Sequence, residues 1–199
     1  MTRLGLLGGT FDPPHYGHLI TAQEVAWQLD LAQVLFLPAR QNPLKQHEVV
    51  TAAAHRCEMV RLAIHDNPRF ELSTLELVRP PPSYTVDLLR GLFSPERELF
   101  FLIGADILPE LPLWHATREI LRMARLVAVN RPGAPAPDLA ALERRLPGSR
   151  ARVHTLQMPG VDISSSDLRA RARLGQPLRY FTPPAVEQYI HTHHLYTAA

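Results

Sequence analysis

Short apolar runs and helical apolar stripes follow one another along this chain. Runs bounded by turn residues are typical of buried strands, and they cover residues 3–8, 33–38, 69–77, 98–104, 125–130 and 152–157. Apolar positions at helical spacing predict helices at residues 17–29, 52–65, 84–92 and 138–146, then one starting after Ser164-Ser165-Ser166 and one at 184–193. Residues 131–137, rich in proline, are expected to form an extended loop.

Strand then helix, repeated with short connections, predicts a parallel sheet covered by helices. We therefore expect an α/β fold, a Rossmann-like doubly wound parallel sheet of five to six strands with helices on both faces. A short C-terminal helical segment, about residues 163–199, would complete a single domain over residues 1–199. In such sheets ligands bind beyond the carboxyl ends of the strands, so residues just after strands are the place to look for chemistry.

Composition sets the class of protein. The 199 residues carry 46% apolar content and a net charge of +2, which suits one domain with an ordinary core. A lone Cys57 forms no internal disulfide and is expected to be a packing residue. No run approaches the ~18 apolar residues of a membrane span, so a cytoplasmic protein without membrane contact is expected.

The first motif is GGTFDPPHYGH, residues 8–18, between a strand and a helix. Gly8 and Gly9 let a phosphate approach the backbone, and the helix start near Gly17 offers unpaired N–H groups. His15 and His18 bracket that start, so two imidazoles can donate to one anion. Two other interpretations remain: a metal site formed with Asp12, or merely polar loop residues. The P-loop and G-x-G-x-x-G patterns are both absent.

The second motif is ISSSDLR, residues 163–169. Ser165 or Ser166 is the expected helix cap, as Thr51 and Ser83 are for two earlier helices. Arg169 and Arg173 share a helix face, whereas Arg171 points elsewhere. A capped surface helix with solvated arginines is the alternative to a second phosphate-binding turn.

Together the two motifs resemble the HxGH and ISSTxxR signatures of the nucleotidyltransferase superfamily, with Ser166 in place of the usual threonine. Segments between and after them are similar to bacterial nicotinate-nucleotide adenylyltransferases, and the similarity spans essentially the whole chain. These segments are PSYTVDLL (82–89), FLIGADILPELPLWHATREIL (101–121), NRPG (130–133) and RYFTPPAVEQYIHTHHLY (179–196). The resemblance implies transfer of the adenylyl group of ATP to nicotinate mononucleotide, giving deamido-NAD and pyrophosphate.

The resemblance also implies roles for individual residues. Those implied to be catalytic are His15, His18, Lys45 and Arg169. Those implied to bind ATP are Gly8, Gly9, Thr10, Phe11, His15, His18, Gly104, Asp106, Ile163, Ser165, Ser166 and Arg169. Those implied to bind nicotinate mononucleotide are Thr10, Lys45, Ser83, Tyr84, Thr85, Asp106, Trp114 and Arg131.

The resemblance further implies a role for Trp114 and a metal cofactor. Trp114 would stack on the pyridine ring, although by itself it is as typical of a core indole. Mg²⁺ is the implied cofactor, held mainly by substrate phosphates and not by a cage of protein ligands.

Other functions are less well supported by the sequence. Residues 122–179 hold eleven arginines against four acidic residues, but no aromatic residues are interleaved as a platform, so a nucleic-acid partner is not expected. One lysine cannot supply the lysine-rich second signature of class I aminoacyl-tRNA synthetases. Another HxGH nucleotidyltransferase, acting on nicotinamide mononucleotide or phosphopantetheine, and a non-catalytic nucleotide sensor remain as alternatives. Whether the chain forms a homo-oligomer is left open.

Lys45 is the single lysine beside 20 arginines, in the loop after the second strand. An ammonium is a compact point charge that follows a phosphate more easily than a rigid guanidinium fork. We therefore expect Lys45→Arg to lower the adenylyl-transfer rate although it conserves charge, as measured by steady-state kinetics. Unchanged kinetics in the variant would contradict a role for this lysine.

Overall fold

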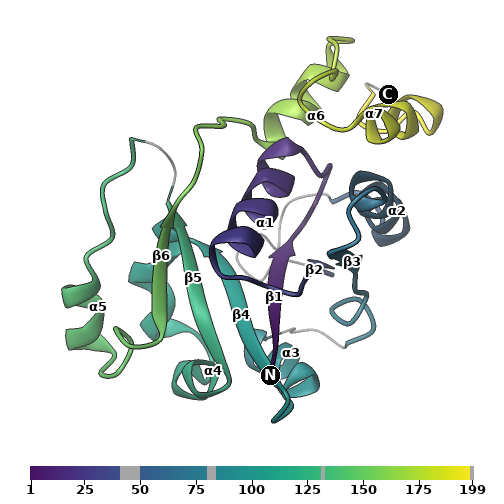
Figure 1. Ribbon diagram of the computed structural model, residues 1–199. Helices are drawn as coiled ribbons and strands as arrows, with labels where there is room; N and C mark the ends of the chain where they lie inside the picture. The colour runs from purple at the N-terminus through teal and green to yellow at the C-terminus, as the bar shows by residue number, and fades with distance from the viewer. Residues whose placement is uncertain (41–49, 80–83, 131–132, 198–199) are drawn as a thin grey trace.

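Six parallel strands form the centre of the molecule. The computed structural model describes residues 1–40, 50–79, 84–130 and 133–197. Its strands are β1 (Thr2–Gly9), β2 (Gln33–Pro38), β3 (Phe70–Leu72), β4 (Arg97–Gly104), β5 (Ala124–Asn130) and β6 (Val153–Gln157). They pair in the order β3-β2-β1-β4-β5-β6, and every neighbouring pair is parallel (Figure 1). Strands β2 and β3 are added on one side of β1 and strands β4 to β6 on its other side, so the strand order reverses between β1 and β4.

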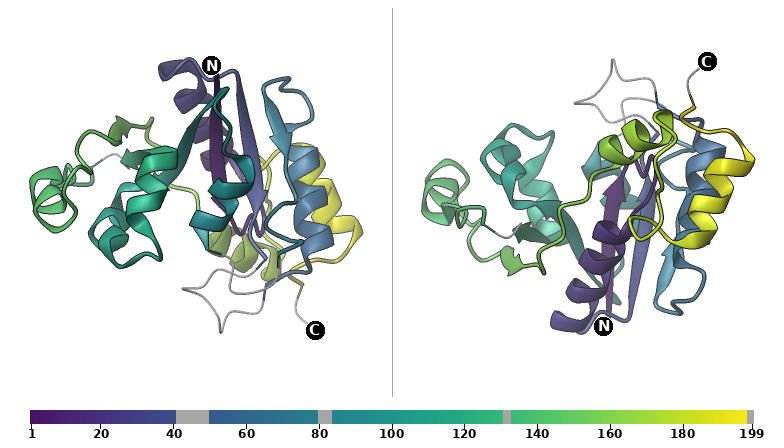
Figure 2. Two further views of the ribbon diagram at one scale, coloured as in Figure 1. Left: turned by 90° about the horizontal axis from the view of Figure 1, so that it is seen from below. Right: turned by 90° about the horizontal axis from the view of Figure 1, so that it is seen from above.

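Helices lie on both sides of this sheet (Figure 2). The α-helices are α1 (Tyr16–Gln28), α2 (Ala53–Ile64), α3 (Thr85–Leu92), α4 (Thr117–Met123), α5 (Leu139–Arg145), α6 (Ser165–Arg173) and α7 (Pro184–Thr192). A 3₁₀ helix, η2 (Ala105–Leu113), follows β4 directly. The expected Rossmann-like fold with a C-terminal helical segment is confirmed.

Strand side chains alternate between two hydrophobic layers. On β1, Leu4 and Leu6 join the layer under α3, η2, α4 and α5, while Leu7 joins the layer under α1, α2, α6 and α7. The same alternation on β4 sends Phe101 to the first layer and Phe100 to the second. Because both faces are buried, these strands are continuous apolar runs and do not alternate with polar residues.

The structure corrects the expected strand and supplies elements that were not expected. The strand expected at 69–77 is only Phe70–Leu72, since the chain turns at Thr74, whose carbonyl oxygen accepts the Leu77 N–H. The prediction left residues 105–124 unassigned. Pro109 and Pro112 there interrupt α-helical hydrogen bonding, and the chain forms the 3₁₀ helix η2 before α4.

The expected helix caps were also wrong. The N-cap of α2 is Ala52, not Thr51. Ser164 and not Ser165 or Ser166 caps α6, because its Oγ accepts the Asp167 N–H at 3.1 Å. The N-cap of α3 is Tyr84 and not Ser83, the third expected cap, which lies outside the described residues.

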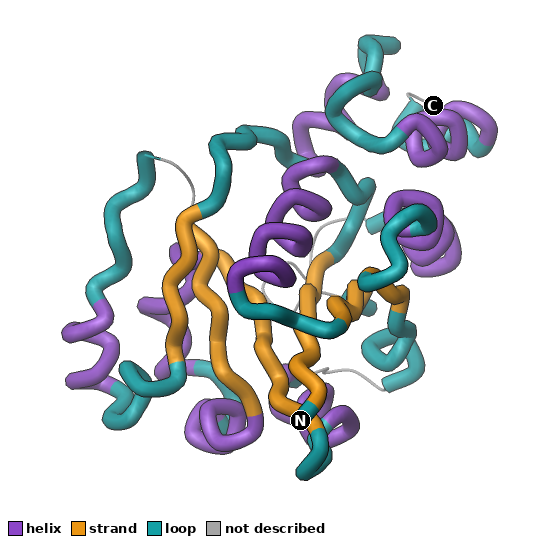
Figure 3. Tube along the Cα trace, viewed as in Figure 1, coloured by secondary structure: helices purple, strands orange, loops and turns teal. Residues whose placement is uncertain are grey.

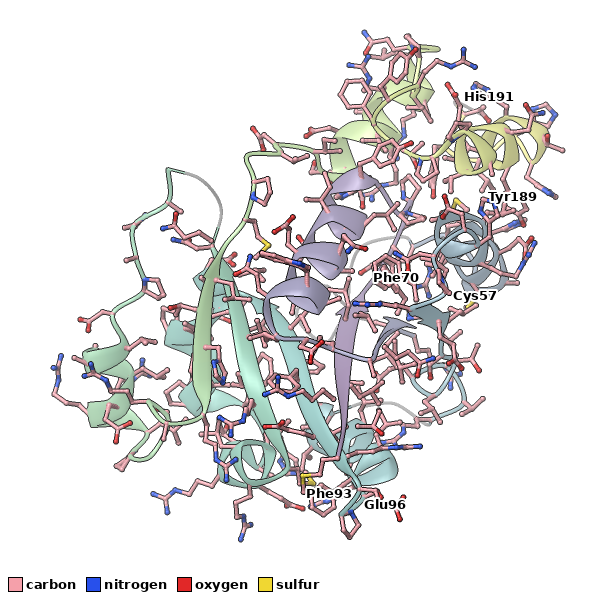
Figure 4. All side chains as sticks on the ribbon, in the orientation of Figure 1. Cys57, Phe70, Phe93, Glu96, Tyr189 and His191 are labelled. Atoms are coloured by element: carbon pink, nitrogen blue, oxygen red, sulfur yellow. The ribbon has the colours of Figure 1, made fainter. Side chains whose placement is uncertain are left out.

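The C-terminal segment folds back over the carboxyl end of the sheet. Both α6 and α7 lie beyond the tip of β1, near the start of α1 (Figures 1 and 3). Helix α7 packs against α2, and Tyr189 on α7 faces the helix that carries Cys57 (Figure 4). The segment therefore meets the chain at the point where β1 ends.

Arg56 on α2 is the largest fully buried side chain of the described residues. Its Nη1 donates to the Thr10 carbonyl oxygen at 2.7 Å and its Nε donates to the Thr51 carbonyl oxygen at 2.9 Å. Burial lowers the pKa of this guanidinium, and attraction to the nearby Asp12 carboxylate opposes that shift. A buried guanidinium, hydrogen-bonded to two backbone carbonyl oxygens, thus ties α2 to the chain that leaves β1.

We expect Arg56→Leu to lower the free energy of unfolding by about 3–5 kcal/mol, because it removes the donors to the Thr10 and Thr51 carbonyl oxygens and the attraction to the buried Asp12 carboxylate. Urea unfolding followed by circular dichroism measures the loss. Arg61→Leu on the same helix is the matched control, since Arg61 forms an exposed pair with Glu58. Equal midpoints for the two variants would contradict the interpretation of Arg56.

Candidate active site

One large cleft opens at the carboxyl ends of β1 and β4, where the strand order reverses. Its volume is about 1260 Å³. Every described residue that the sequence marked as a site residue lines it: Gly8, Gly9, Thr10, Phe11, His15, His18, Tyr84, Thr85, Gly104, Asp106, Trp114, Ile163, Ser165, Ser166 and Arg169. Lys45, Ser83 and Arg131 lie outside the described residues. The structure brings distant segments together at one place, while the role of each residue stays a prediction.

The Phe11 side chain packs against the turn that follows β1. Its φ of 51° is left-handed, and its ring is 1% exposed. The ring packs against the position that a Cβ on Gly9 would occupy, at 3.1 Å, and meets the His18 ring edge-on at a centroid distance of 5.0 Å. Only the backbone of Phe11 is therefore placed to meet a ligand, and its side chain supports the glycine turn.

His15 and His18 form a stacked pair at the start of α1. Their ring centroids are 3.8 Å apart, and the His15 backbone N–H donates to His18 Nδ1 at 3.2 Å. A Cβ on Gly17 would meet the His15 ring at 3.0 Å. Glycine at this position therefore makes room for the first imidazole, which accounts for the small residue between the two histidines.

His18 is held in the form of a neutral hydrogen-bond donor. Burial, and then the neighbouring His15, lower the pKa of His18 well below its usual value. Because Nδ1 accepts the His15 N–H, the single proton of the neutral ring sits on Nε2. A neutral imidazole with Nε2–H suits donation to a phosphate oxygen.

The C-terminal segment binds three successive carbonyl oxygens of this turn. Arg169 Nη1 donates to the Asp12 carbonyl, Ser165 Oγ to the Pro13 carbonyl and Thr182 Oγ1 to the Pro14 carbonyl, each at 2.8 Å. The hydroxyl proton of Ser165 is therefore used inside the protein. Arg169 keeps further N–H groups for a ligand, as its guanidinium has five.

Asp12 is buried and fully engaged. Its side chain is 2% exposed, Oδ1 accepts the Tyr196 hydroxyl at 2.6 Å, and Oδ2 accepts the Thr51 N–H at 3.1 Å. This carboxylate therefore uses both of its oxygens to hold the turn. Within the described ranges, no three His, Cys, Asp or Glu side chains gather in a way that would hold a metal ion, so the geometry gives no support to the metal alternative for His15 and His18.

The far end of the cleft is aromatic. Trp114 follows η2 and meets Phe101 edge-on at 6.4 Å, so it packs on the core while lining the cleft. Tyr84, at the start of α3, lies against His115 with ring centroids 4.5 Å apart. Such a wall suits a flat ring.

Gly104 and Asp106 line the cleft where β4 ends and η2 begins. Asp106 is exposed in the first turn of η2, directly after β4. Its Oδ1 occupies the space that a Cβ on Gly104 would need. Glycine at the end of the strand therefore lets this carboxylate fold back at the rim, where it can accept hydroxyl hydrogen bonds.

Some residues of the site had no recognised signal in the sequence. Arg56, Thr182 and Tyr196 touch the turn but lie 46 to 184 positions from it along the chain. An arginine inside the apolar pattern of 52–65 was the one available sign of a buried charge.

Arg171 points away from the helix face that carries Arg169, as expected: its guanidinium stacks on Phe181 at 4.4 Å. Among the described residues, no helix is long and apolar enough to cross a bilayer.

Comparison with known proteins agrees with this geometry. Residues 6–171 match the cytidylyltransferase-like family model. Similar curated proteins are probable nicotinate-nucleotide adenylyltransferases of Roseiflexus sp. (49% identity, covering 97% of both chains) and Symbiobacterium thermophilum (47% identity, covering 98% of this chain and 96% of that one). A solved Plasmodium falciparum nicotinic acid mononucleotide adenylyltransferase, complexed with NaAD, has the same fold with a TM-score of 0.78 at 18% identity, covering 98% of both chains.

The low pKa of His18 predicts how stability depends on pH. Below the usual value of about 6.5 the unfolded chain takes up a proton that the folded chain refuses, so the free energy of unfolding decreases as pH falls. The contribution approaches about 1.4 kcal/mol per pH unit. His18→Gln removes this proton and keeps an acceptor for the His15 N–H, because glutamine serves at the same capping position.

We therefore expect the unmodified chain to lose more stability than His18→Gln between about pH 7 and about pH 5. Urea unfolding at several pH values measures the difference, and the histidines that do not contact His18 contribute equally to both curves. Parallel curves would show that His18 titrates normally in the folded chain.

Proposed function

This chain belongs to the nicotinate-nucleotide adenylyltransferases of the cytidylyltransferase-like family, and we infer that its cleft transfers the adenylyl group of ATP to nicotinate mononucleotide. The products are deamido-NAD and pyrophosphate, which places the reaction in NAD biosynthesis. The observation that carries this conclusion is the 49% identity to such a relative over 97% of both chains.

The reaction needs positioning more than it needs a base. The phosphate of the mononucleotide has a second pKa of about 6 and is already largely ionised at neutral pH. Its oxygen attacks the α-phosphorus of ATP, a new P–O bond forms, and the bond to the β-phosphate breaks to release pyrophosphate. Two polyanions must be held in line, and approximation of this kind contributes roughly 7–11 kcal/mol.

The stacked histidines supply donors for the charge that develops on the α-phosphate. His18 presents Nε2–H without a positive charge of its own, and His15 lies against it at 3.8 Å. At the start of α1 the Tyr16 and His18 N–H groups already donate to the Phe181 and His15 carbonyl oxygens, so the imidazoles are the main donors here. Because the Asp12, Pro13 and Pro14 carbonyl oxygens are occupied by donors from the C-terminal segment, they do not repel the anion.

Arg169 and the start of α6 suit the departing pyrophosphate. The guanidinium keeps N–H groups beyond the one bound to Asp12, and the Ser166 Oγ accepts from it at 3.4 Å. With the Ser165 hydroxyl bound to Pro13, the contribution of Ser165 to ATP binding would come from its backbone N–H. Lys45 would add a further charge from the loop after β2.

The aromatic end suits the pyridine ring of the mononucleotide. Trp114, which lines the cleft together with Tyr84 and Thr85, would hold the ring by stacking, and Asp106 would accept ribose hydroxyls. ATP would enter as its magnesium complex. An ion held by phosphate oxygens and water needs no cage of protein carboxylates, which fits the donor-rich lining of this cleft.

The function is tested by incubating the purified chain with ATP, Mg²⁺ and nicotinate mononucleotide, and measuring pyrophosphate and deamido-NAD. Nicotinamide mononucleotide and phosphopantetheine are assayed in parallel, and we expect the highest kcat/KM for nicotinate mononucleotide. A folded chain that binds ATP without releasing pyrophosphate would be a nucleotide sensor and not this enzyme.

We expect His18→Ala to keep the fold and to lower kcat at least ~100-fold, because it removes one donor to the transition state. Steady-state kinetics measures the loss, and circular dichroism checks the fold. An unchanged kcat would make His18 a structural residue.

A further inference from the structure

Tyr196 reaches the turn before α1 from nearly the other end of the chain. It follows α7 with a left-handed φ of 65° and is partly buried. Its hydroxyl donates to Asp12 Oδ1 at 2.6 Å and lies 3.9 Å from the Met59 sulfur. Tyr196 is not among the residues that line the cleft, so it acts on a ligand only through other groups.

The tyrosine is kept as a hydrogen-bond donor. Burial raises the pKa of the Tyr196 hydroxyl far above its usual value, and the hydrogen bond and negative charge of Asp12 raise it further. The proton therefore stays on the phenol and is shared with a carboxylate that is 2% exposed. A charge-assisted bond of this kind is among the stronger ones in proteins.

Asp12 passes this constraint on to the histidines. Two residues separate it from His15, and the carbonyl oxygens of residues 12, 13 and 14 are each bound by the C-terminal segment. The Tyr16 N–H then donates to the Phe181 carbonyl at 3.0 Å, where α1 begins. Tyr196 contributes the one bond of this set that reaches the Asp12 side chain from the C-terminal segment.

We propose that Tyr196 is a positioning residue for adenylyl transfer, which fixes Asp12 and thereby the stacked arrangement of His15 and His18. The proposal rests on the function inferred above. If the Tyr196 hydroxyl is removed, Asp12 keeps the Thr51 N–H but loses the donor to its other oxygen, so its side chain is held less firmly. The turn that carries the imidazoles then loses its alignment, although every cleft residue is still present.

Tyr196→Phe removes the hydroxyl and keeps the ring. Tyr189→Phe is a matched control on α7, because the Tyr189 hydroxyl bonds His55 Nδ1 of α2 at 2.9 Å and touches no part of the turn. Both substitutions remove one hydrogen bond between the C-terminal segment and the rest of the chain. All measurements are made at a temperature at which circular dichroism shows each variant folded.

We expect Tyr196→Phe to lower kcat by about 10- to 100-fold, as a small displacement of reacting groups does. The KM values for both substrates should stay close to those of the unmodified chain, because no cleft side chain has changed. Tyr189→Phe should match the unmodified chain in kcat. Equal kcat values for the two variants, or a rise in KM that accounts for the whole loss, would overturn the proposal.

A second measurement needs no turnover. Long-range ¹H–¹⁵N correlation spectra of the histidine rings, assigned with His15 and His18 substitutions, report which ring nitrogen of His18 carries the proton. We expect Nε2–H in the unmodified chain and in Tyr189→Phe, and a mixture of tautomers in Tyr196→Phe. An unchanged tautomer in Tyr196→Phe would overturn the positioning role, whereas an inactive unmodified chain with the expected spectra would overturn the inferred function alone.

Discussion

The fixed turn between β1 and α1 is the constraint on which the rest of this site depends. It is held by a buried carboxylate, Asp12, whose oxygens accept from Thr51 and Tyr196 and whose charge attracts the fully buried Arg56. Burial of such groups is costly unless each has its partners, so the arrangement is stable only when all the segments are in place. The site is therefore formed by the completed fold and not by the motif alone.

The same bonds decide the electrostatic character of the cleft. Donors from the C-terminal segment occupy the carbonyl oxygens of residues 12–14, while the imidazoles and the other N–H groups of Arg169 remain for an anion. The low pKa of His18 follows from this crowded setting, since a buried ring beside another imidazole is easier to keep neutral. The neutral His18 ring and the Arg169 guanidinium would both stabilise phosphate charge. Such an arrangement suits a transfer that needs no enzyme base.

Local patterns were enough for most of the fold. The apolar runs of β1 and β4 and the helical stripes between strands predicted a doubly wound parallel sheet, because both signals depend only on spacing along the chain. Cap positions were less predictable, as in ISSSDLR, where three successive serines offer nearly the same chemistry and only the geometry selects Ser164. The end of β3 and the 3₁₀ helix η2 were missed, since an edge strand and a proline-interrupted turn have weak periodicity.

For this chain the sequence by itself determined where most strands and helices lie along the chain, because their apolar spacing is local. It also determined the two phosphate-type motifs at the ends of these elements, because glycines, histidines and serines leave local signals. Only the tertiary structure decided which oxygen each donor meets. It turned Ser165 toward Pro13, buried Arg56 beneath Thr10, and brought Tyr196 to Asp12 across 184 positions. Contacts between residues so far apart leave no local periodicity in the sequence, so their partners are set by the packing of the sheet and of the C-terminal helices.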